Sequence, residues 1–189
     1  MSRVDDFKQL IKENTDDESV LCNYEICKSC KEKRGLTCCQ TCPCELSPTD
    51  LKEVTKENIL KLLDTGYVTI DSWDGDLTFA GYDEYEHVYY LRARSREDQG
   101  PVEFGFGGCC SLLVDAEGCL LDFKHRPYYG RTMPVCGSNS NLDPELSSKQ
   151  RSCLEWRPYH DLLEEVIREL VKLNVEISAF TLFNIFHLL

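Results

Sequence analysis

The sequence lacks any long hydrophobic run. Nowhere do about 18 uncharged apolar residues follow one another, as a membrane-spanning helix requires. The first residues, MSRVDDFKQLIKEN, also lack the apolar core of a secretory signal. Both absences exclude the transmembrane and secretory classes, so we expect a soluble cytoplasmic protein without a membrane span.

Positive charge is scarce. The chain has 21 Lys and Arg against 33 Asp and Glu, which gives a net charge of -12. Such a protein repels phosphate, and this excludes general nucleic-acid binding. The sequence also shows no clear nucleophile and base pair, no phosphate-binding glycine loop and no HExxH helix. It therefore favours a protein that acts through a protein partner over an enzyme.

Cysteine, by contrast, is abundant, with 12 in 189 residues. Cytoplasmic thiols are kept reduced, so this pattern indicates metal binding or redox chemistry before disulfides. The adjacent pairs Cys38-Cys39 and Cys109-Cys110 support this interpretation, because neighbouring cysteines do not easily form a disulfide with each other. A secreted, disulfide-linked domain whose leader was removed is the alternative.

The cysteines form two clusters separated by a long stretch of chain. Cys27-x2-Cys30 places two thiols on one turn, and zinc readily takes such a pair among its four tetrahedral ligands, with sulfur about 2.3 Å away. Glycines precede Cys109 and Cys119, which fits a backbone that bends closely around an ion. The predicted metal ligands are Cys27, Cys30, Cys38, Cys39, Cys42, Cys44, Cys109, Cys110, Cys119 and Cys136.

Ten thiols exceed the needs of two tetrahedral sites. Either some are not ligands, or sulfur atoms bridge neighbouring ions. Cys22 and Cys153 lie outside the ligand set and are expected to be ordinary thiols. His125, beside Arg126-Pro127, is expected to be a turn residue. Because metal binding contributes to folding, serine at Cys30 or Cys119 should lower both bound metal and stability.

The polar and apolar pattern predicts helices at both ends of the chain. Ser2 caps an amphipathic helix that reaches Ile11, and a second helical pattern runs from Ser47 to Gly66 with a break near Thr55. An apolar stripe predicts a helix over 162–171. A last helix over 180–189 is apolar nearly all round, which favours packing into the core over docking on a partner.

Short antiparallel strands are predicted between these helices. Asp74-Gly75 is expected to form a turn, Ala93 to Gly100 an exposed connection, and Gly137 to Ser148 a loop. Tyr82, Tyr85, Tyr89 and Tyr90 form either a recognition surface or a half-buried strand edge. The expected strands are 68–70, 87–91, 102–106, 112–114 and 120–123.

These elements predict one α+β domain over residues 1–189, a small antiparallel sheet with peripheral helices organised around the Cys metal sites. The first Cys cluster occupies 22–44, the second 109–136, and the C-terminal helices 158–189.

The order of CKSC, CC, ELSPTDL, CCSLL, GCLL and HRP resembles the zinc- or iron-chelating cysteine-cluster family, called YkgJ-like or CxxCxxCC. The resemblance covers about Cys27 to Cys136 and implies a compact α+β fold and bound metal. It assigns the opening ligands to Cys27, Cys30, Cys38 and Cys39, and the later pair to Cys110 and Cys119. Arg126-Pro127, Arg131 and Pro134 match the closing phrase of the family.

The sequence departs from that family in three places. Seven residues instead of two separate Cys30 from Cys38, and Cys42 and Cys44 are additional. Gly130 stands where the family has its last cysteine. Cys136 is the candidate for that ligand position.

Three hypotheses for function follow. In the first, the metal is structural zinc, and the protein works by binding a protein partner. In the second, the clusters hold iron or an iron-sulfur cluster and carry out redox chemistry, although the usual ferredoxin run is absent. In the third, the thiols sense oxidants and release zinc when oxidised.

Overall fold

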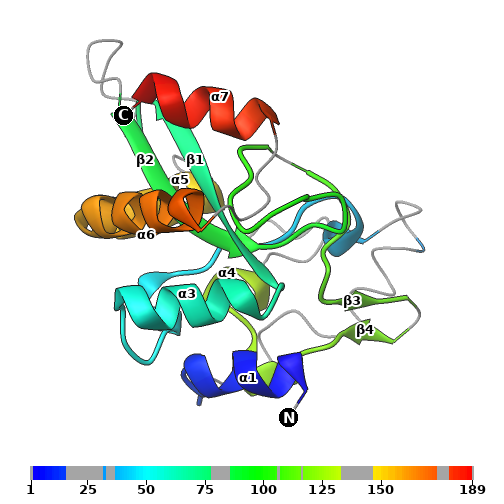
Figure 1. The fold of residues 1–189 in the computed structure, drawn as a ribbon. Coiled ribbons are helices and arrows are strands. Elements are labelled where there is room, and N and C mark those ends of the chain that lie inside the picture. Colours follow the sequence, from blue (N-terminus) through cyan, green and yellow to red (C-terminus); the bar gives the residue numbers. More distant parts are fainter. Residues whose placement is uncertain are drawn as a thin grey trace.

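The computed structural model describes residues 2–15, 32, 37–77, 86–105, 107–115, 117–132, 147–173 and 179–188. This part of the chain has the predicted α+β architecture, with helices around small antiparallel sheets (Figure 1). The main sheet pairs β1 (Val68–Gly75) with β2 (Glu86–Ala93), and the second pairs β3 (Leu113–Val114) with β4 (Gly118–Cys119).

The β1–β2 pair forms the centre of the fold. Its register places Val68 opposite Ala93 and Gly75 opposite Glu86. Two further segments extend the pair through single bridges: Glu45 pairs with Arg92, and Val102 pairs with Ile70. The strand predicted over 102–106 is thus present only as one bridge among the described residues.

Helices cover this central pair. The helices α5 (Ser148–Trp156) and α6 (His160–Lys172) contact β2, and α6 also contacts α3 (Lys56–Asp64). The Trp156 side chain is fully buried and donates a hydrogen bond from Nε1 to the Leu46 carbonyl at 2.7 Å. This bond fixes α5 to the segment that follows Cys44.

The N-terminal helix was predicted correctly. Helix α1 (Arg3–Leu10) begins after Ser2, whose side chain accepts a hydrogen bond from the Asp5 backbone N–H. It packs on α3, which begins after Thr55. The break expected near Thr55 is therefore real, and the chain before it forms only a short 3₁₀ turn, η3 (Pro48–Asp50).

Two local predictions were wrong, and one helix was not predicted. Asp74 and Gly75 continue β1 instead of turning, because they pair with His87 and Glu86. The predicted strand 120–123 instead runs into a 3₁₀ turn, η4 (Phe123–His125), which Asp122 caps by accepting the His125 N–H. Helix α5 was missed, because it begins at Ser148, where the expected loop ends, and lies before the C-terminal helices predicted from residue 158.

The connection from Ala93 to Gly100 is not simply exposed. Ala93 and Ser95 are buried, and Asp98 binds the buried Arg92 side chain. The tyrosine strip is also not a recognition surface where it is described. Tyr89 and Tyr90 are buried in the core, while Tyr82 and Tyr85 lie outside the described residues.

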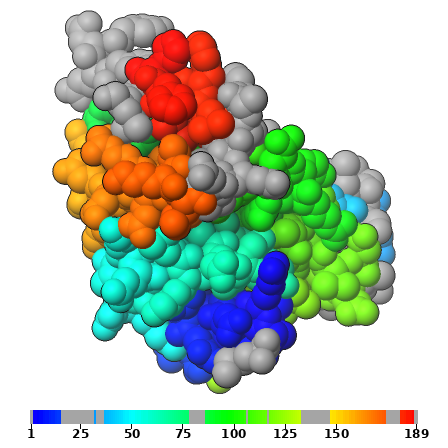
Figure 2. Space-filling model, in the orientation of Figure 1, coloured from blue at the N-terminus to red at the C-terminus, as the bar shows by residue number. Residues whose placement is uncertain are grey.

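The last helix, α7 (Ala179–Leu188), packs against the rest of the chain on one side only. Ile185 is buried, whereas Phe183 is 60% exposed and Phe186 is 70% exposed. Figure 2 shows α7 in red on the surface of the molecule. The expected packing into the core therefore holds at Ile185, whereas Phe183 and Phe186 stay exposed.

Within the described ranges, every helix is too short or too polar to cross a lipid bilayer.

Candidate metal centre

The described parts of the two cysteine clusters meet beside β2. The segment from Cys44 to Leu46 runs along the end of this strand, where the Cys44 carbonyl accepts the Ala93 N–H at 2.8 Å. On the other side, Cys110 forms an antiparallel bridge with Ser95. The sequence places these two segments far apart, and the strand brings them together.

A direct backbone bond joins the clusters. Cys39 lies in the 3₁₀ turn η2 (Cys38–Gln40), and its carbonyl accepts the Cys110 N–H at 2.7 Å. Cys119 joins the group through β4, where it pairs with Leu113 only three residues beyond Cys110. Cys110 is buried in the hydrophobic core, and Cys39, Cys44 and Cys119 pack against that core.

We call Cys39, Cys44, Cys110 and Cys119 the inner cysteines. Burial raises the pKa of the Cys44 thiol well above its ordinary value, and the nearby Cys110, Cys39 and Cys119 thiols raise it further. Burial also raises the pKa of Cys110 to about 12, with Cys119 contributing. The inner cysteines therefore lie within electrostatic reach of one another. A cation among them would reverse this effect, because it stabilises thiolates.

The inner cysteines lie near each other without forming a closed ligand set. Among the described residues, no three Cys, His, Asp or Glu side chains converge closely enough to hold a metal ion. Their donor chemistry nevertheless fits zinc, which takes four thiolates in structural sites. Cys44 and Cys110 are free thiols.

Gly130 lies directly beside the sulfur of Cys44. It belongs to the short helix α4 (Tyr128–Arg131), and a Cβ atom built at this glycine would lie 3.0 Å from Cys44 Sγ. The sulfur of Cys44 thus lies next to the space that a side chain would fill if residue 130 were not glycine. This makes Cys44 the described thiol best placed to substitute for a cysteine there, whereas Cys136 lies outside the described residues.

A buried carboxylate holds α4 in this place. Asp50 accepts the Ser47 N–H and the Tyr128 N–H, each at 2.8 Å. Burial raises the pKa of Asp50 to about 6, while both hydrogen bonds and Arg131 oppose the rise. Asp50 thus links the turn after Cys44 to the helix that carries Gly130.

Glycines shape the backbone before Cys109 and before Cys119. Gly107 and Gly108 have φ angles of +110° and +101°, and Gly118 before Cys119 has +96°. A Cβ at Gly108 would lie 2.3 Å from Glu97 Oε2, which accepts the Cys109 N–H at 2.9 Å. Only glycine leaves room for this contact.

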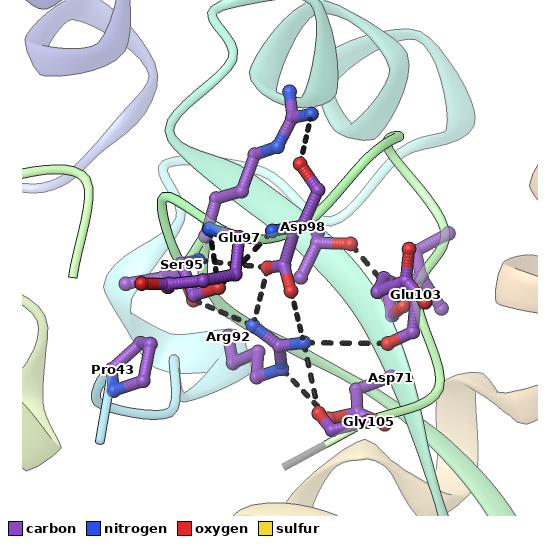
Figure 3. Close-up of polar contacts among 12 residues, drawn as sticks. Pro43, Asp71, Arg92, Ser95, Glu97, Asp98, Glu103 and Gly105 are labelled. Atoms are coloured by element: carbon purple, nitrogen blue, oxygen red, sulfur yellow. Dashed lines mark hydrogen bonds and ion pairs between the residues drawn. The ribbon is translucent and has the colours of Figure 1, made fainter. Parts of the chain in front are cut away.

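A buried ion-pair network anchors the loop between β2 and Cys109. Arg92 donates from Nε to Asp71 and from Nη1 to Asp98, each at 2.7 Å (Figure 3). Its Nη2 also donates to the Gly105 carbonyl at 3.0 Å, and Asp98 accepts the Ser95 N–H. Because every charge here is paired and hydrogen-bonded, the network can fix the loop that carries Cys109 and Cys110.

Of the other predicted ligands that are described, Cys38, Cys42 and Cys109 are not among the cysteines that pack in or against the core, although Cys109 also raises the pKa of Cys110. Cys42 lies one turn after Cys38, and its pKa is raised to about 11, mainly by burial. Cys109 points its thiol towards the Cys110 carbonyl at 3.9 Å. Cys27, Cys30 and Cys136 lie outside the described residues, as does Cys22.

Residues outside the predicted ligand set also have clear positions. Cys153 is fully buried in the core, which matches the expectation of an ordinary thiol. The His125 ring nitrogen Nδ1 lies 2.7 Å from Asp122, within the 3₁₀ turn η4. Arg131 is buried, with its guanidinium near the Phe123 and Tyr128 rings.

Sequence reasoning missed the contact between Cys44 and Gly130 and the buried pair of Arg92 with Asp71. Spacing could have suggested the first, because Cys44 is an extra cysteine and Gly130 a missing one. No comparable pattern in the sequence indicated the buried pair of Arg92 with Asp71.

No match was found in comparisons with known protein families, with curated proteins or with solved structures.

Proposed function

We propose that this chain is a cytoplasmic zinc protein, a divergent relative of the zinc- or iron-chelating cysteine-cluster family, that uses a thiolate centre to hold its fold and acts through a protein partner. The observation that carries the proposal is the gathering of the inner cysteines from separate segments, with Cys39 and Cys110 joined by a backbone bond. To hold one ion, the four side chains would have to converge further than they do among the described residues.

The connections around the inner cysteines support a structural role for the metal. The segments of Cys39, Cys44 and Cys110 are irregular, and each is held to its neighbours by only a few backbone bonds. An ion bound by thiolates from all of them would add its binding free energy to folding. We expect zinc to be needed for full stability.

The exposed surface of α7 supports the proposal that the protein acts through a protein partner. Phe183 and Phe186 are large apolar side chains left exposed on one helix. Aromatic residues of this kind are enriched where proteins bind one another. A protein partner that covers them would bury both rings.

The test is metal content after anaerobic purification, with two matched thiol substitutions. Cys119→Ser should lower the zinc content by one ion per chain and lower the melting temperature, whereas Cys153→Ser should leave the zinc content unchanged. Iron with broad visible absorbance would support an iron or iron-sulfur protein instead. Absence of any tightly bound metal from the unsubstituted protein would overturn the proposal.

A further inference from the structure

Two imidazoles lie beside one another between β2 and α6. The imidazole of His87 on β2 and that of His160, the first residue of α6, have ring centroids 6.0 Å apart, with planes at 89°. Tyr89 contacts both rings: it stacks on His160 at 5.0 Å and meets the edge of His87 at 4.6 Å. The three aromatic side chains form one packed unit.

Each imidazole has one buried nitrogen without a partner. His87 Nε2 and His160 Nδ1 are shielded from solvent, and neither makes a hydrogen bond within the described part of the chain. A buried polar atom left unpaired costs about 1–3 kcal/mol. Two such atoms on neighbouring rings therefore require an explanation, such as a bound ion or water.

The other nitrogen of His87 is already engaged. Its Nδ1 lies 2.6 Å from Asp74 Oδ1 on the paired strand β1. A carboxylate at this nitrogen keeps the proton on Nδ1 and leaves the lone pair of Nε2 available. Metal-binding histidines usually have a partner of this kind on the nitrogen that does not bind the ion.

The distance between the rings suits one shared ion. A zinc–nitrogen bond is about 2.0–2.1 Å long. If one ion bound both imidazoles in a straight line, the ring centres would be separated by two zinc–nitrogen bonds and two distances from ring nitrogen to ring centre. That separation slightly exceeds the 6.0 Å between the centroids. The separation of the rings is thus compatible with one ion held by both imidazoles at an obtuse angle.

The surrounding charge favours a cation. Asp74 and Glu164 both raise the pKa of the neighbouring Tyr89 phenol, after the larger effect of burial. Their carboxylates therefore place negative potential at this unit, although Glu164 also pairs with Arg168 at 2.9 Å. A divalent ion here would be drawn in by that potential.

We propose that His87 and His160 form a second cation site, which binds a borderline divalent ion such as Zn²⁺ through His87 Nε2 and His160 Nδ1, with water completing its coordination. The site is separate from the inner cysteines. His87 lies at the end of β2 that pairs with Asp74, whereas Cys44 bonds to Ala93 at the other end. Six residues of extended strand span about 20 Å.

The experiment follows the imidazole nitrogens by NMR while Zn²⁺ is added to protein whose tight zinc sites are already filled. The signals of His87 and His160 should shift together and saturate at one further equivalent. His87→Gln and His160→Gln should each weaken this step at least tenfold. Both variants are checked by thermal melting, so that loss of the fold is recognised.

His125→Gln is the matched control. His125 has the same contact with a carboxylate, Asp122, at 2.7 Å, and it lies on a different element. The substitution should leave the titration unchanged. Absence of a shift in the unsubstituted protein, or an unchanged shift of His160 in His87→Gln, would overturn the proposal. The proposed thiolate centre is tested separately, by the content of tightly bound zinc before the titration begins.

Discussion

At the scale of single residues, the contact between Cys44 and Gly130 shows which two positions of the chain can place a sulfur atom at the same point beside the other inner cysteines. The 3.0 Å approach of Cys44 Sγ to a Cβ at position 130 means that a cysteine could supply sulfur from either segment. Gly130 lies in a helix and has no positive φ angle, so a side chain there causes no backbone strain.

This contact predicts a rescue by exchange. Cys44→Ala should lower zinc content, and the double variant Cys44→Ala with Gly130→Cys should restore most of it, because the new thiol enters the same space. Gly130→Cys alone should be destabilised by crowding. Zinc content and thermal melting measure both effects. A double variant that binds no more zinc than Cys44→Ala would contradict this placement.

Arg92 gives a second prediction for a single residue. Arg92→Met should lower the free energy of unfolding by about 3–5 kcal/mol, because it leaves Asp71 and Asp98 buried without their cation. Arg168→Met removes an exposed pair with Glu164 and should cost at most about 0.5 kcal/mol. Urea denaturation of both variants checks the difference. Equal losses would refute the central role of the Arg92 network.

At the scale of elements, the glycine loop before Cys109 can be tested against a nearby glycine. Gly108→Ala should cost about 1–3 kcal/mol, because alanine is strained at a φ of +101° and its Cβ meets Glu97 and Ser95. Gly105→Ala is the control, since nothing lies within 4 Å of a Cβ there. Chemical denaturation compares them. A Gly108→Ala protein as stable as Gly105→Ala would contradict this account.

The elements also show how far the sequence was informative. The capped helix after Ser2 and the break at Thr55 were predictable, because caps and apolar spacing act locally. The extension of β1 through Gly75 was not, because its pairing with Glu86 depends on a distant segment.

The site was predictable to a similar degree. Cysteine spacing indicated that the two clusters belong together, and their segments do meet at Cys39 and Cys110. The spacing did not show that Cys44 and Cys119 pack against the core while Cys42 and Cys109 do not. That difference depends on which side of each turn faces the core. Binding of metal by these thiols stays a prediction.

At the scale of the whole molecule, the buried thiols make the stability of the metal-free protein depend on pH. Burial raises the pKa of Cys110 and Cys153 to about 12 and that of Cys44 well above its ordinary value of 9.0. A raised pKa means that the folded state favours the protonated thiol. This stability is complete below about pH 9 and is lost as the pH rises towards 12.

Urea denaturation of chelator-treated protein at pH 7.5, 9 and 10.5 should therefore show falling stability. The decline should be smaller in Cys153→Ala, which removes one of the buried thiols. Zinc-loaded protein should decline less, because the ion keeps its thiolates ionised throughout this range. A flat profile in the metal-free protein would show that these thiols are not buried as described.

The neighbouring positions of Cys44 and Gly130 have one more consequence, for the way such chains diverge. Two sequences can carry a cysteine at different positions and still place its sulfur atom at the same point in the fold. The spacing of cysteines along the chain can then change while the position of the sulfur in the fold is kept.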